Sequence, residues 1–527
     1  MAKKVTGKKT VAGSAADKKP QSARKMARAG EPEIPVDRPL LPVNAGQLET
    51  TCGEFRGDCT RDTFEPAKHY SSVLMQQGRV QLDADWNEQA DIVLHYLRAM
   101  ARDIIGPFGG PDNGGFDIGI SAANRDLTIL KGHYYVDGIL CENENTVAYS
   151  GQPHLPLLPS EKDDLGKFFK ENIPFLVYLD VWERHITWFY DPKVREIALN
   201  GPDTATRSQV IWQVKVLAAD NLPADKKIQD EFIKKILPAG CKDIQDFIRN
   251  TWSRFNFRTG TIPQLKVMAK TPDDPLSVCI LQPGSRYRGP ENQLYRVEIH
   301  APGTACAAGT TSCATFKWSR DNSSVNYPVV SMTENTATLA NLGRDDRSTI
   351  REGDILEIVD DFHSLRQEPG YLVRAGSVDR SGMKVTFAPD VIAPTTGSNV
   401  LLRRWDHREE LLKDGKKLID GGIPVEESAE AEAWTDLEDG IQIQFQPKGN
   451  YYQTGDYWLI PARTISGNVG WPWDETGFQP RPPHGIAHHY APLGVAFRQN
   501  EEFSICSCRC VFNRPCGTAA FKKTGDG

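Results

Sequence analysis

FLVYLDVW at residues 175–182 and QVIWQVKV at residues 209–216 are the segments that decide the fold class. Both are rich in β-branched and aromatic residues, a composition typical of half-buried strands. A polar loop, GPDTATR at 201–207, lies between them. The two segments therefore predict neighbouring stretches of β structure.

Further short strands are predicted on both sides of this pair. Asp137-Gly138 is a turn dipeptide, so residues 132–140 predict a tight hairpin. Residues 314–405 contain several short strands, including an in-and-out alternation at 316–319, which indicates a small barrel or sandwich. No repeat of 20 to 50 residues is evident, which excludes solenoids and propellers. The other expected strands are 127–130, 352–360, 383–387, 400–405, 441–445 and 457–460.

An amphipathic helix is predicted at residues 85–105, closed by Gly106-Pro107. Asp85 is expected to cap its first turn, with Glu88 as the reciprocal partner. Apolar residues recur at three- and four-residue steps and share one face: Trp86, Ala90, Val93, Leu94, Leu97, Met100, Ala101 and Ile104. Residues 225–255 predict two short helices broken at 238–240. The sequence thus predicts a mainly β protein with a few helices (α+β), with small β barrels or sandwiches plus an N-terminal amphipathic helix.

Composition divides the 527-residue chain into several domains and two tails. Residues 1–29 hold nine Lys and Arg residues, one acid and no aromatic residue, so a disordered basic tail is predicted. It is a solubilising tail, a contact arm for an acidic partner or nucleic acid, or a loading signal. The predicted segments are the tail 1–45, a docking region 46–150 with helix and hairpin, a β-rich domain 151–310 with a helical insertion, a barrel or sandwich 311–405, a β-rich region 406–505 and a Cys-rich tail 506–527.

No apolar stretch approaches the ~18 residues that a membrane span needs, so no membrane span is expected. The first residues lack the apolar core of an export signal. We therefore expect synthesis in the cytoplasm without a Sec signal.

Eleven cysteines fall into pairs, a cluster and single residues. Cys52 with Cys59, and Cys306 with Cys313, each enclose a short loop that a disulfide closes in an oxidising medium. Cys141, Cys241 and Cys279 stand alone. The final cluster presents thiolates for a soft metal, disulfides or free thiols, although C-x-C spacing differs from that of zinc knuckles. This cluster consists of Cys506, Cys508, Cys510 and Cys516.

Three imidazoles, those of His484, His488 and His489, form the other candidate metal site. On a helix, His484 and His488 would share one face and hold an ion. Prolines on both sides and Gly485 instead favour an extended loop or edge strand, in which the rings splay. We therefore expect structural histidines.

The usual signatures of catalysis are absent from the sequence: no phosphate-binding loop, nucleophile elbow, H-E-x-x-H motif or dinucleotide fingerprint occurs. A non-enzymatic protein without a cofactor is expected. The eleven tryptophans either anchor strand-on-strand cores or form a carbohydrate-binding surface.

Residues 60–64, TRDTF, and 69–88, HYSSVLMQQGRVQLDADWNE, resemble the opening of an uncharacterised bacterial family. Its members occur with phage-tail-like contractile injection systems. The Gly-Arg pair, followed several residues later by an Asn-Glu pair that opens the helix and then by a Tyr-Val-Asp-Gly hairpin, is similar to the start of phage baseplate and tail-fibre attachment proteins. The likeness spans roughly residues 55–510 and continues through 177–184, 201–207, 287–300, 316–322 and 454–458.

The resemblance implies a non-enzymatic structural or adaptor component of a phage-tail-like contractile injection particle, in its baseplate, fibre base or another attached part. Implied partners are baseplate, tube, sheath or fibre proteins, further copies of the chain, or a cell-surface glycan, with nucleic acid only through the basic tail. Such a particle can be released from the cell. The alternatives are a surface glycan-binding or glycan-processing module, and a delivered cargo or toxin loaded by its tail. The residues expected to dock or oligomerise the chain are Arg79, Trp86, Asn87, Glu88, Val93 and Leu97.

Overall fold

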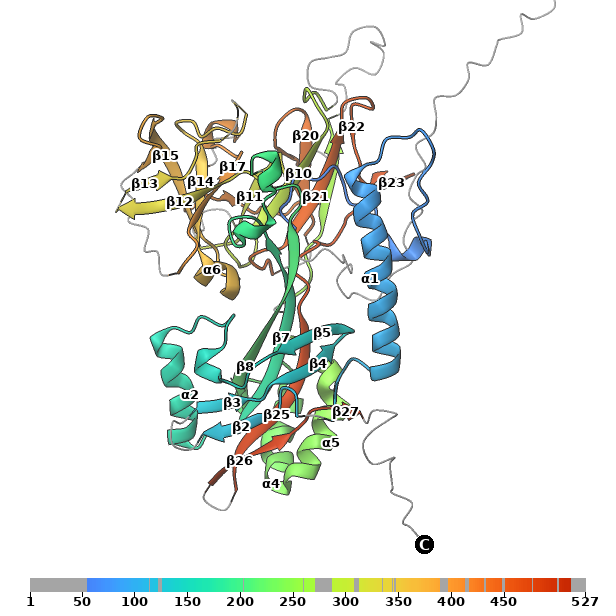
Figure 1. Ribbon diagram of the computed structural model, residues 1–527, viewed down its shortest axis with the longest axis vertical. Helices are drawn as coiled ribbons and strands as arrows, with labels where there is room; N and C mark the ends of the chain where they lie inside the picture. The colour runs from blue at the N-terminus through green and yellow to red at the C-terminus, as the bar shows by residue number, and fades with distance from the viewer. Residues whose placement is uncertain are drawn as a thin grey trace, which may run out of the picture.

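Two long antiparallel strands, β7 (Phe175–Ile186) and β8 (Arg207–Ala218), pair over their whole length and form the spine of the molecule. The sequence predicted both, and each is longer than expected. In Figure 1 they run from the end of the molecule that carries α2, α4 and α5 toward the end that carries the barrel. The computed structural model describes residues 55–512 except 113, 122–125, 202, 259, 271–286, 308–311, 334, 344, 346, 389–396, 413–416, 431–432, 448–450, 476 and 500–501.

The predicted fold class is confirmed: the protein is mainly β, α+β and multi-domain. β7 and β8 belong to a four-stranded sheet of order β26-β25-β7-β8, completed by β25 (His489–Gln499) and β26 (Glu502–Ser507). The three C-terminal elements of the chain therefore pack against its first half. The neighbouring smaller sheets are β27 (Val511–Phe512), β1 (Phe108–Pro111), β4 (Gly132–Val136), β5 (Ile139–Asn143), and β2 (Ile118–Ser121), β3 (Asp126–Ile129), β6 (Val147–Ala148).

The opposite end holds a sandwich of two sheets around its own core. Trp318, Trp458 and Phe445 are buried there together. The five-stranded sheet contains β18 (Ile423–Pro424), β11 (Thr315–Ser319), β10 (Gln293–Ile299), β21 (Tyr457–Arg463) and β22 (Asn468–Val469), and the three-stranded sheet contains β19 (Thr435–Asp436), β20 (Ile441–Phe445) and β9 (Leu265–Ala269). A small hairpin, β23 (Trp473–Asp474) and β24 (Gly477–Phe478), lies in the Trp- and Pro-rich loop.

A closed six-stranded barrel confirms the small barrel predicted within residues 314–405. The predicted unit began too early, because β11 pairs with β10 and β18 in the sandwich. The alternation predicted at 316–319 is also wrong, since all five residues of β11 are buried between the sandwich core and the barrel. The barrel strands are β12 (Asn326–Thr333), β13 (Thr336–Leu339), β16 (Lys384–Ala388), β15 (Tyr371–Asp379), β14 (Ile355–Val359) and β17 (Leu401–Trp405).

Helices lie outside the sheets and join the parts of the molecule. Those predicted near 225–255 are α3 (Lys226–Glu231), a π-helical turn (Phe232–Ile236), α4 (Leu237–Ala239) and α5 (Cys241–Thr251), with the break at Gly240. They pack on the face of the β7 sheet opposite to the smaller sheets. α6 (Asp361–Arg366) ties the barrel to the spine and to α2 (Pro159–Glu171): Asp361 accepts a 2.7 Å hydrogen bond from Arg184 of β7, and Arg366 donates one of 2.6 Å to Glu161.

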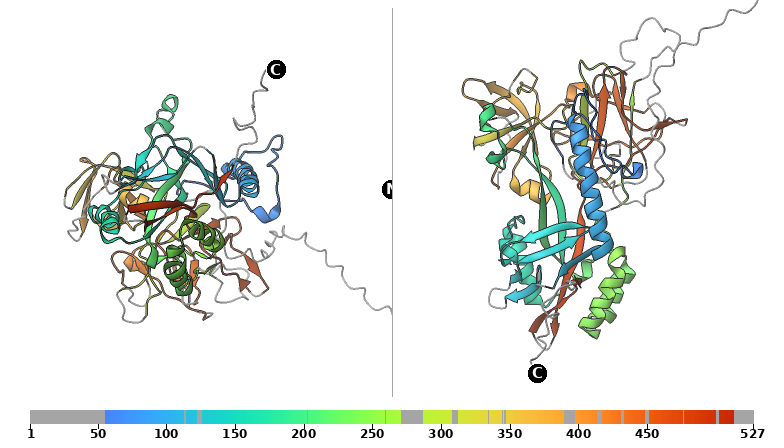
Figure 2. Two further views of the ribbon diagram at one scale, coloured as in Figure 1. Left: turned by 90° about the horizontal axis from the view of Figure 1, so that it is seen from below. Right: turned by 45° about the vertical axis from the view of Figure 1, so that its right-hand side comes forward.

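The N-terminal amphipathic helix is α1 (Asp83–Ile105), which ends at Gly106 as predicted. The predicted capping pair is wrong. Leu82 is the N-cap residue, and the Asp85 carboxylate lies inside the first turn, where it accepts a hydrogen bond from the Leu82 N–H. α1 runs along one side of the molecule, from the sandwich end to the β4–β5 hairpin (Figures 1 and 2).

Candidate functional site

The side of α1 that faces the protein carries both apolar and polar groups. Ala84, Asp91 and Ile92 are its buried residues, and Arg98 forms a 2.9 Å ion pair with Glu183 of β7. Near the end of α1 the backbone of Arg98 packs directly on Gly138, in the turn of the predicted hairpin. A Cβ atom at Gly138 would lie 2.3 Å from the Arg98 carbonyl oxygen, and the φ of +81° there also favours glycine.

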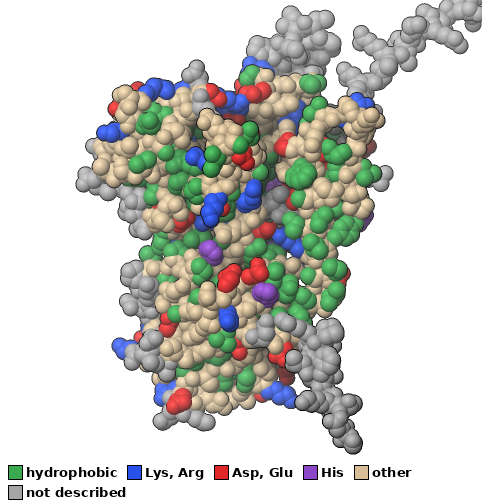
Figure 3. Space-filling model, viewed as in Figure 1, with side chains coloured by type: hydrophobic (Ala, Val, Ile, Leu, Met, Phe, Trp, Pro, Cys, Tyr) green, Lys and Arg blue, Asp and Glu red, His purple; other side chains and the backbone are tan. Residues whose placement is uncertain are grey.

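The apolar stripe predicted for this helix faces solvent. Its six large side chains are between 36% and 77% exposed: Trp86, Val93, Leu94, Leu97, Met100 and Ile104. Ordinary surface helices turn such a stripe toward the core. On α1 the apolar stripe faces solvent instead. The side toward the protein contacts ionic and backbone groups of the rest of the chain, such as Glu183 and Gly138. Figure 3 shows hydrophobic side chains gathered on the surface where α1 lies.

Residues 55–82, which we term the strap, hold the first half of α1. The Thr60 backbone N–H and hydroxyl both donate to Asp83, and the Thr63 hydroxyl donates to Glu88 at 2.6 Å. The Val73 N–H donates to the Gln89 side chain at 2.8 Å. The strap contains one short 3-10 helix, Pro66–Lys68, and itself exposes several apolar side chains: Tyr70, Leu74, Met75, Val80 and Leu82.

The residues predicted to dock the chain therefore fall into two groups. Trp86, Val93 and Leu97 lie on the exposed stripe, and Arg79 is exposed in the strap. Asn87 is half-buried, and Glu88 is turned away from the stripe toward the strap by its bond from Thr63. The sequence found the stripe through its periodicity, but it carried no signal for the hydrogen bonds that engage Glu88.

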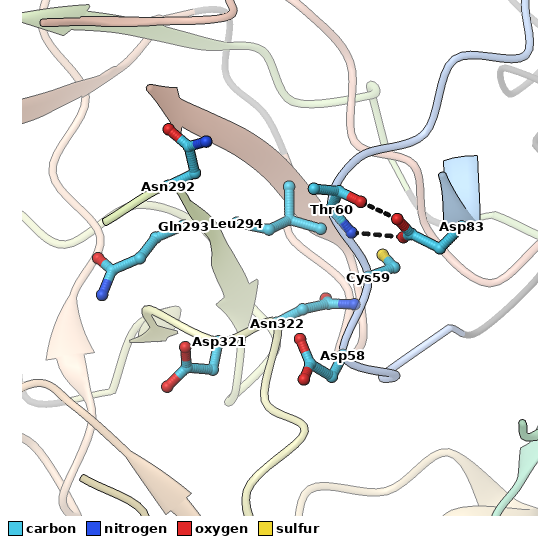
Figure 4. A pocket seen from close by; sticks show the side chains of 9 residues that line it. All are labelled: Asp58, Cys59, Thr60, Asp83, Asn292, Gln293, Leu294, Asp321 and Asn322. Atoms are coloured by element: carbon cyan, nitrogen blue, oxygen red, sulfur yellow. Dashed lines mark hydrogen bonds between the residues drawn. The ribbon is translucent and has the colours of Figure 1, made fainter. Parts of the chain in front are cut away.

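A cavity of about 240 Å³ lies where the strap meets the sandwich (Figure 4). Burial, followed by the nearby carboxylate of Asp83, raises the pKa of the Cys59 thiol to about 12. Burial also raises the pKa of Asp321, to about 6. A neutral thiol is a poor nucleophile, so Cys59 is not an activated nucleophile in this cavity. Its walls are formed by Asp58, Cys59, Thr60, Asp83, Asn292, Gln293, Leu294, Asp321 and Asn322.

Behind this cavity a buried ionic network joins the strap, the sandwich and the barrel. Glu298 of β10 accepts two hydrogen bonds from Arg56 of the strap, at 2.6 and 3.1 Å, and one from Arg296 at 2.6 Å. Lys317 of β11 lies 3.3 Å from Glu298 and 2.6 Å from Glu357 of β14.

The charge state of this network follows from its partners. Burial opposes ionisation of Glu298, but Arg56, Arg296 and Lys317 outweigh it and hold the pKa of the carboxyl well below its ordinary value. Lys317, Arg403 and His300 likewise lower the pKa of Glu357 to about 2, although burial opposes this. The acids are therefore ionised and paired, an arrangement that fixes three parts of the chain relative to one another. Sequence reasoning missed the network because its members are far apart in the chain.

The three C-terminal histidines lie in an extended segment, as predicted, and contact different partners. His488 lies 2.6 Å from Asp180 of β7 and 2.6 Å from Gln367, which follows α6. His489 lies 2.9 Å from Asp137, at the hairpin turn. Burial lowers the pKa of His484 to about 4, and its ring stacks on Tyr457. The rings thus serve three separate contacts.

Two disulfides show how four of the cysteines are paired. Cys306–Cys313 closes the short loop that the sequence predicted. Cys506 pairs with Cys241, so Cys241 does not stand alone and Cys506 is not available to a metal with its neighbours. Cys508 and Cys510 are free thiols, while Cys516 lies outside the described residues. Cys59 is also free; its expected partner Cys52 and the single Cys279 lie outside the described residues too.

The described residues contain no group of three or more His, Cys, Asp or Glu side chains that could hold a metal ion. Four tryptophans anchor cores and are unavailable to a sugar: Trp182, Trp318, Trp405 and Trp458. The feature with the clearest capacity for recognition is therefore the outward stripe of α1.

The chain belongs to a family of unknown function, DUF6519, whose model matches residues 55–238 and 241–524. No curated protein and no solved structure matches the chain. The description of the family assigns no activity, so the function has to be argued from the residues of this chain.

Proposed function

We propose that this chain is a non-enzymatic structural or adaptor component of a phage-tail-like contractile injection particle, in its baseplate, fibre base or another attached part. The observation that carries the proposal is the apolar stripe of α1, which faces solvent along the side of the molecule. An exposed apolar patch of this size marks an interaction site. The likeness of residues 60–88 to a family that occurs with such particles supports this setting, and so does the similarity of the Gly-Arg, Asn-Glu and hairpin pattern to the start of phage baseplate and tail-fibre attachment proteins.

The rigid frame around α1 supports a mechanical role. The strap is tied to the buried ionic network through Arg56, and the end of α1 packs on the hairpin turn at Gly138. A load applied to α1 is therefore passed to the sandwich and to the spine through buried or closely packed contacts. None of the described helices is both long and apolar enough to cross a bilayer.

The test is the composition of particles purified from cells that make this chain. We expect the chain to sediment with sheath and tube proteins. A variant carrying Val93→Glu and Leu97→Glu should fold but be lost from the particles. The matched control carries Ile197→Glu and Val330→Glu, two exposed apolar positions away from α1, one between β7 and β8 and one in the barrel strand β12, and should be retained. Particles that lack the native chain, or that retain the α1 variant in full, would contradict the proposal.

A further inference from the structure

The stripe of α1 repeats every seven residues. Trp86, Val93 and Met100 are seven apart, and so are Ala90, Leu97 and Ile104, which follow them at four-residue steps. In heptad notation the first set occupies d positions and the second set occupies a positions. Alternating steps of four and three give the 3.5-residue spacing of a coiled-coil seam, in which side chains of one helix enter holes in another.

All six seam residues are exposed in the single chain. The residues on the opposite side of the helix are already engaged: Glu88 with the strap, Arg98 with β7, and His95 with the ring of Phe64 at 5.7 Å. α1 thus has one side used by its own chain and a seam left for a partner.

We infer that α1 pairs with α1 of a second copy of this chain, through a coiled-coil seam that runs the length of the helix. The inference deepens the proposed function by naming what covers the stripe. It needs only the chain itself, so it stands or fails separately from membership of the particle.

The charges beside the seam favour a second copy over a charged partner. The flanking e positions are Asn87, Leu94 and Ala101, and the flanking g positions are Gln89, Tyr96 and Asp103. Only Asp103 of these six is charged at neutral pH, so two copies meet without rows of like charge, and the salt bridges that would select a different charged helix are missing. Two copies of α1 also have the same heptad repeat, because they have the same sequence, and a symmetric interface requires such a match.

The available area is sufficient for a stable pair. The 23 residues of α1 span about 35 Å, on the scale of 1.5 Å per residue. Its seam side chains together with Leu94 and Tyr96 expose roughly 700 Å², taking ~150–250 Å² for a whole large side chain. The strap lies beside the g positions through its bond to Gln89 and adds Leu74 and Val80. The total reaches the ~800 Å² per partner of a stable interface.

Sedimentation velocity of the purified full-length chain, from nanomolar to high micromolar concentration, tests the inference. As the concentration rises, the sedimenting mass of the native chain should increase from that of one chain to that of two chains. The variant with Val93→Glu and Leu97→Glu should associate about 100-fold or more weakly, because paired copies would bury four like charges. The control with Ile197→Glu and Val330→Glu should associate as the native chain does.

Thermal unfolding of both variants at low concentration provides the folding check, and we expect transitions close to that of the native chain because all four positions are exposed. A native chain that keeps one chain mass at every concentration overturns the inference, and so does undiminished association of the seam variant. A single-chain species in which α1 amides are strongly protected from hydrogen exchange by residues 1–54 also overturns it.

Discussion

Replacing Glu298 by glutamine removes the central negative charge of the buried network. The side chain is 2% exposed and accepts from Arg56 and Arg296, and it lies 3.3 Å from the Lys317 ammonium. In the Glu298→Gln variant these three cations keep their burial but lose their shared counter-charge. Glu357 remains as the counter-charge of Lys317.

The expected cost follows from that burial. Removing one partner of a buried ion pair destabilises a protein by about 3–5 kcal/mol, because the remaining charge stays desolvated without compensation. Glu298 serves three cations, so we expect the upper part of that range. An exposed pair provides the matched control: Glu410 accepts a 2.8 Å bond from Arg374, and both side chains are about half exposed. Its Glu410→Gln change should cost at most about 1 kcal/mol.

Urea unfolding followed by tryptophan fluorescence measures both variants, since Trp318 and Trp405 lie next to the network. Restoring a complementary arrangement with Arg56→Met in the Glu298→Gln background should recover part of the loss. Equal free energies of unfolding for the Glu298→Gln and Glu410→Gln variants would refute the reasoning, because they would mean that burial gives the network no special weight.

Three further predictions concern pH, packing and disulfides. Burial, reinforced by Lys317 for His300, lowers the pKa of His300 to about 3, and burial lowers that of His407 to about 4. Each of these two histidines therefore binds fewer protons in the folded protein than in the unfolded chain below pH ~6.5, so its contribution to the free energy of unfolding is full above that pH and falls by up to about 1.4 kcal/mol per pH unit toward pH ~4; urea titrations should show a smaller loss of stability toward low pH in a variant with His300→Gln and His407→Gln than in the native chain, and the same pH dependence in both would contradict this. Gly138→Ala should lower the stability by more than about 1 kcal/mol and speed hydrogen exchange at the end of α1, because its Cβ would strike the α1 backbone at a positive φ; unchanged exchange there would show that the contact is not made. Cys241→Ser opens a link across 265 residues and should destabilise by roughly 5 kcal/mol, against roughly 2 for Cys306→Ser, whose link spans 7; the opposite order in calorimetry would exclude loop closure as the cause.

Local patterns in the sequence predicted the elements well, because short-range chemistry determines them. Asp137-Gly138 forms the tight turn that its residue types favour, with both φ angles positive. The run 175–182 lies inside β7, and the apolar repeat of residues 86–104 lies on α1. The capping of α1 differs from the prediction, since Asp85 and Glu88 found partners other than each other.

Contacts between distant segments were not predictable from those patterns. Lys317 sits in a strand whose alternation suggested an exposed lysine, and its burial is compensated by Glu298 on the neighbouring strand and by Glu357, which approaches from the barrel. Cys241 and Cys506 are 265 residues apart and meet because β26 packs beside α5. Periodicity likewise showed which residues of α1 share a face, but it could not show that this face looks outward.

Oxidative footprinting of Met100 tests the central claim most directly, because this residue belongs to the exposed stripe and its thioether is readily oxidised. Met383, an exposed residue of the barrel end, is the internal standard. We predict that Met100 is oxidised as readily as Met383 in the dilute chain and is several-fold protected, relative to Met383, in concentrated chain and in purified particles. An unchanged ratio of the two methionines in all three samples would contradict the assignment of α1 as an assembly surface.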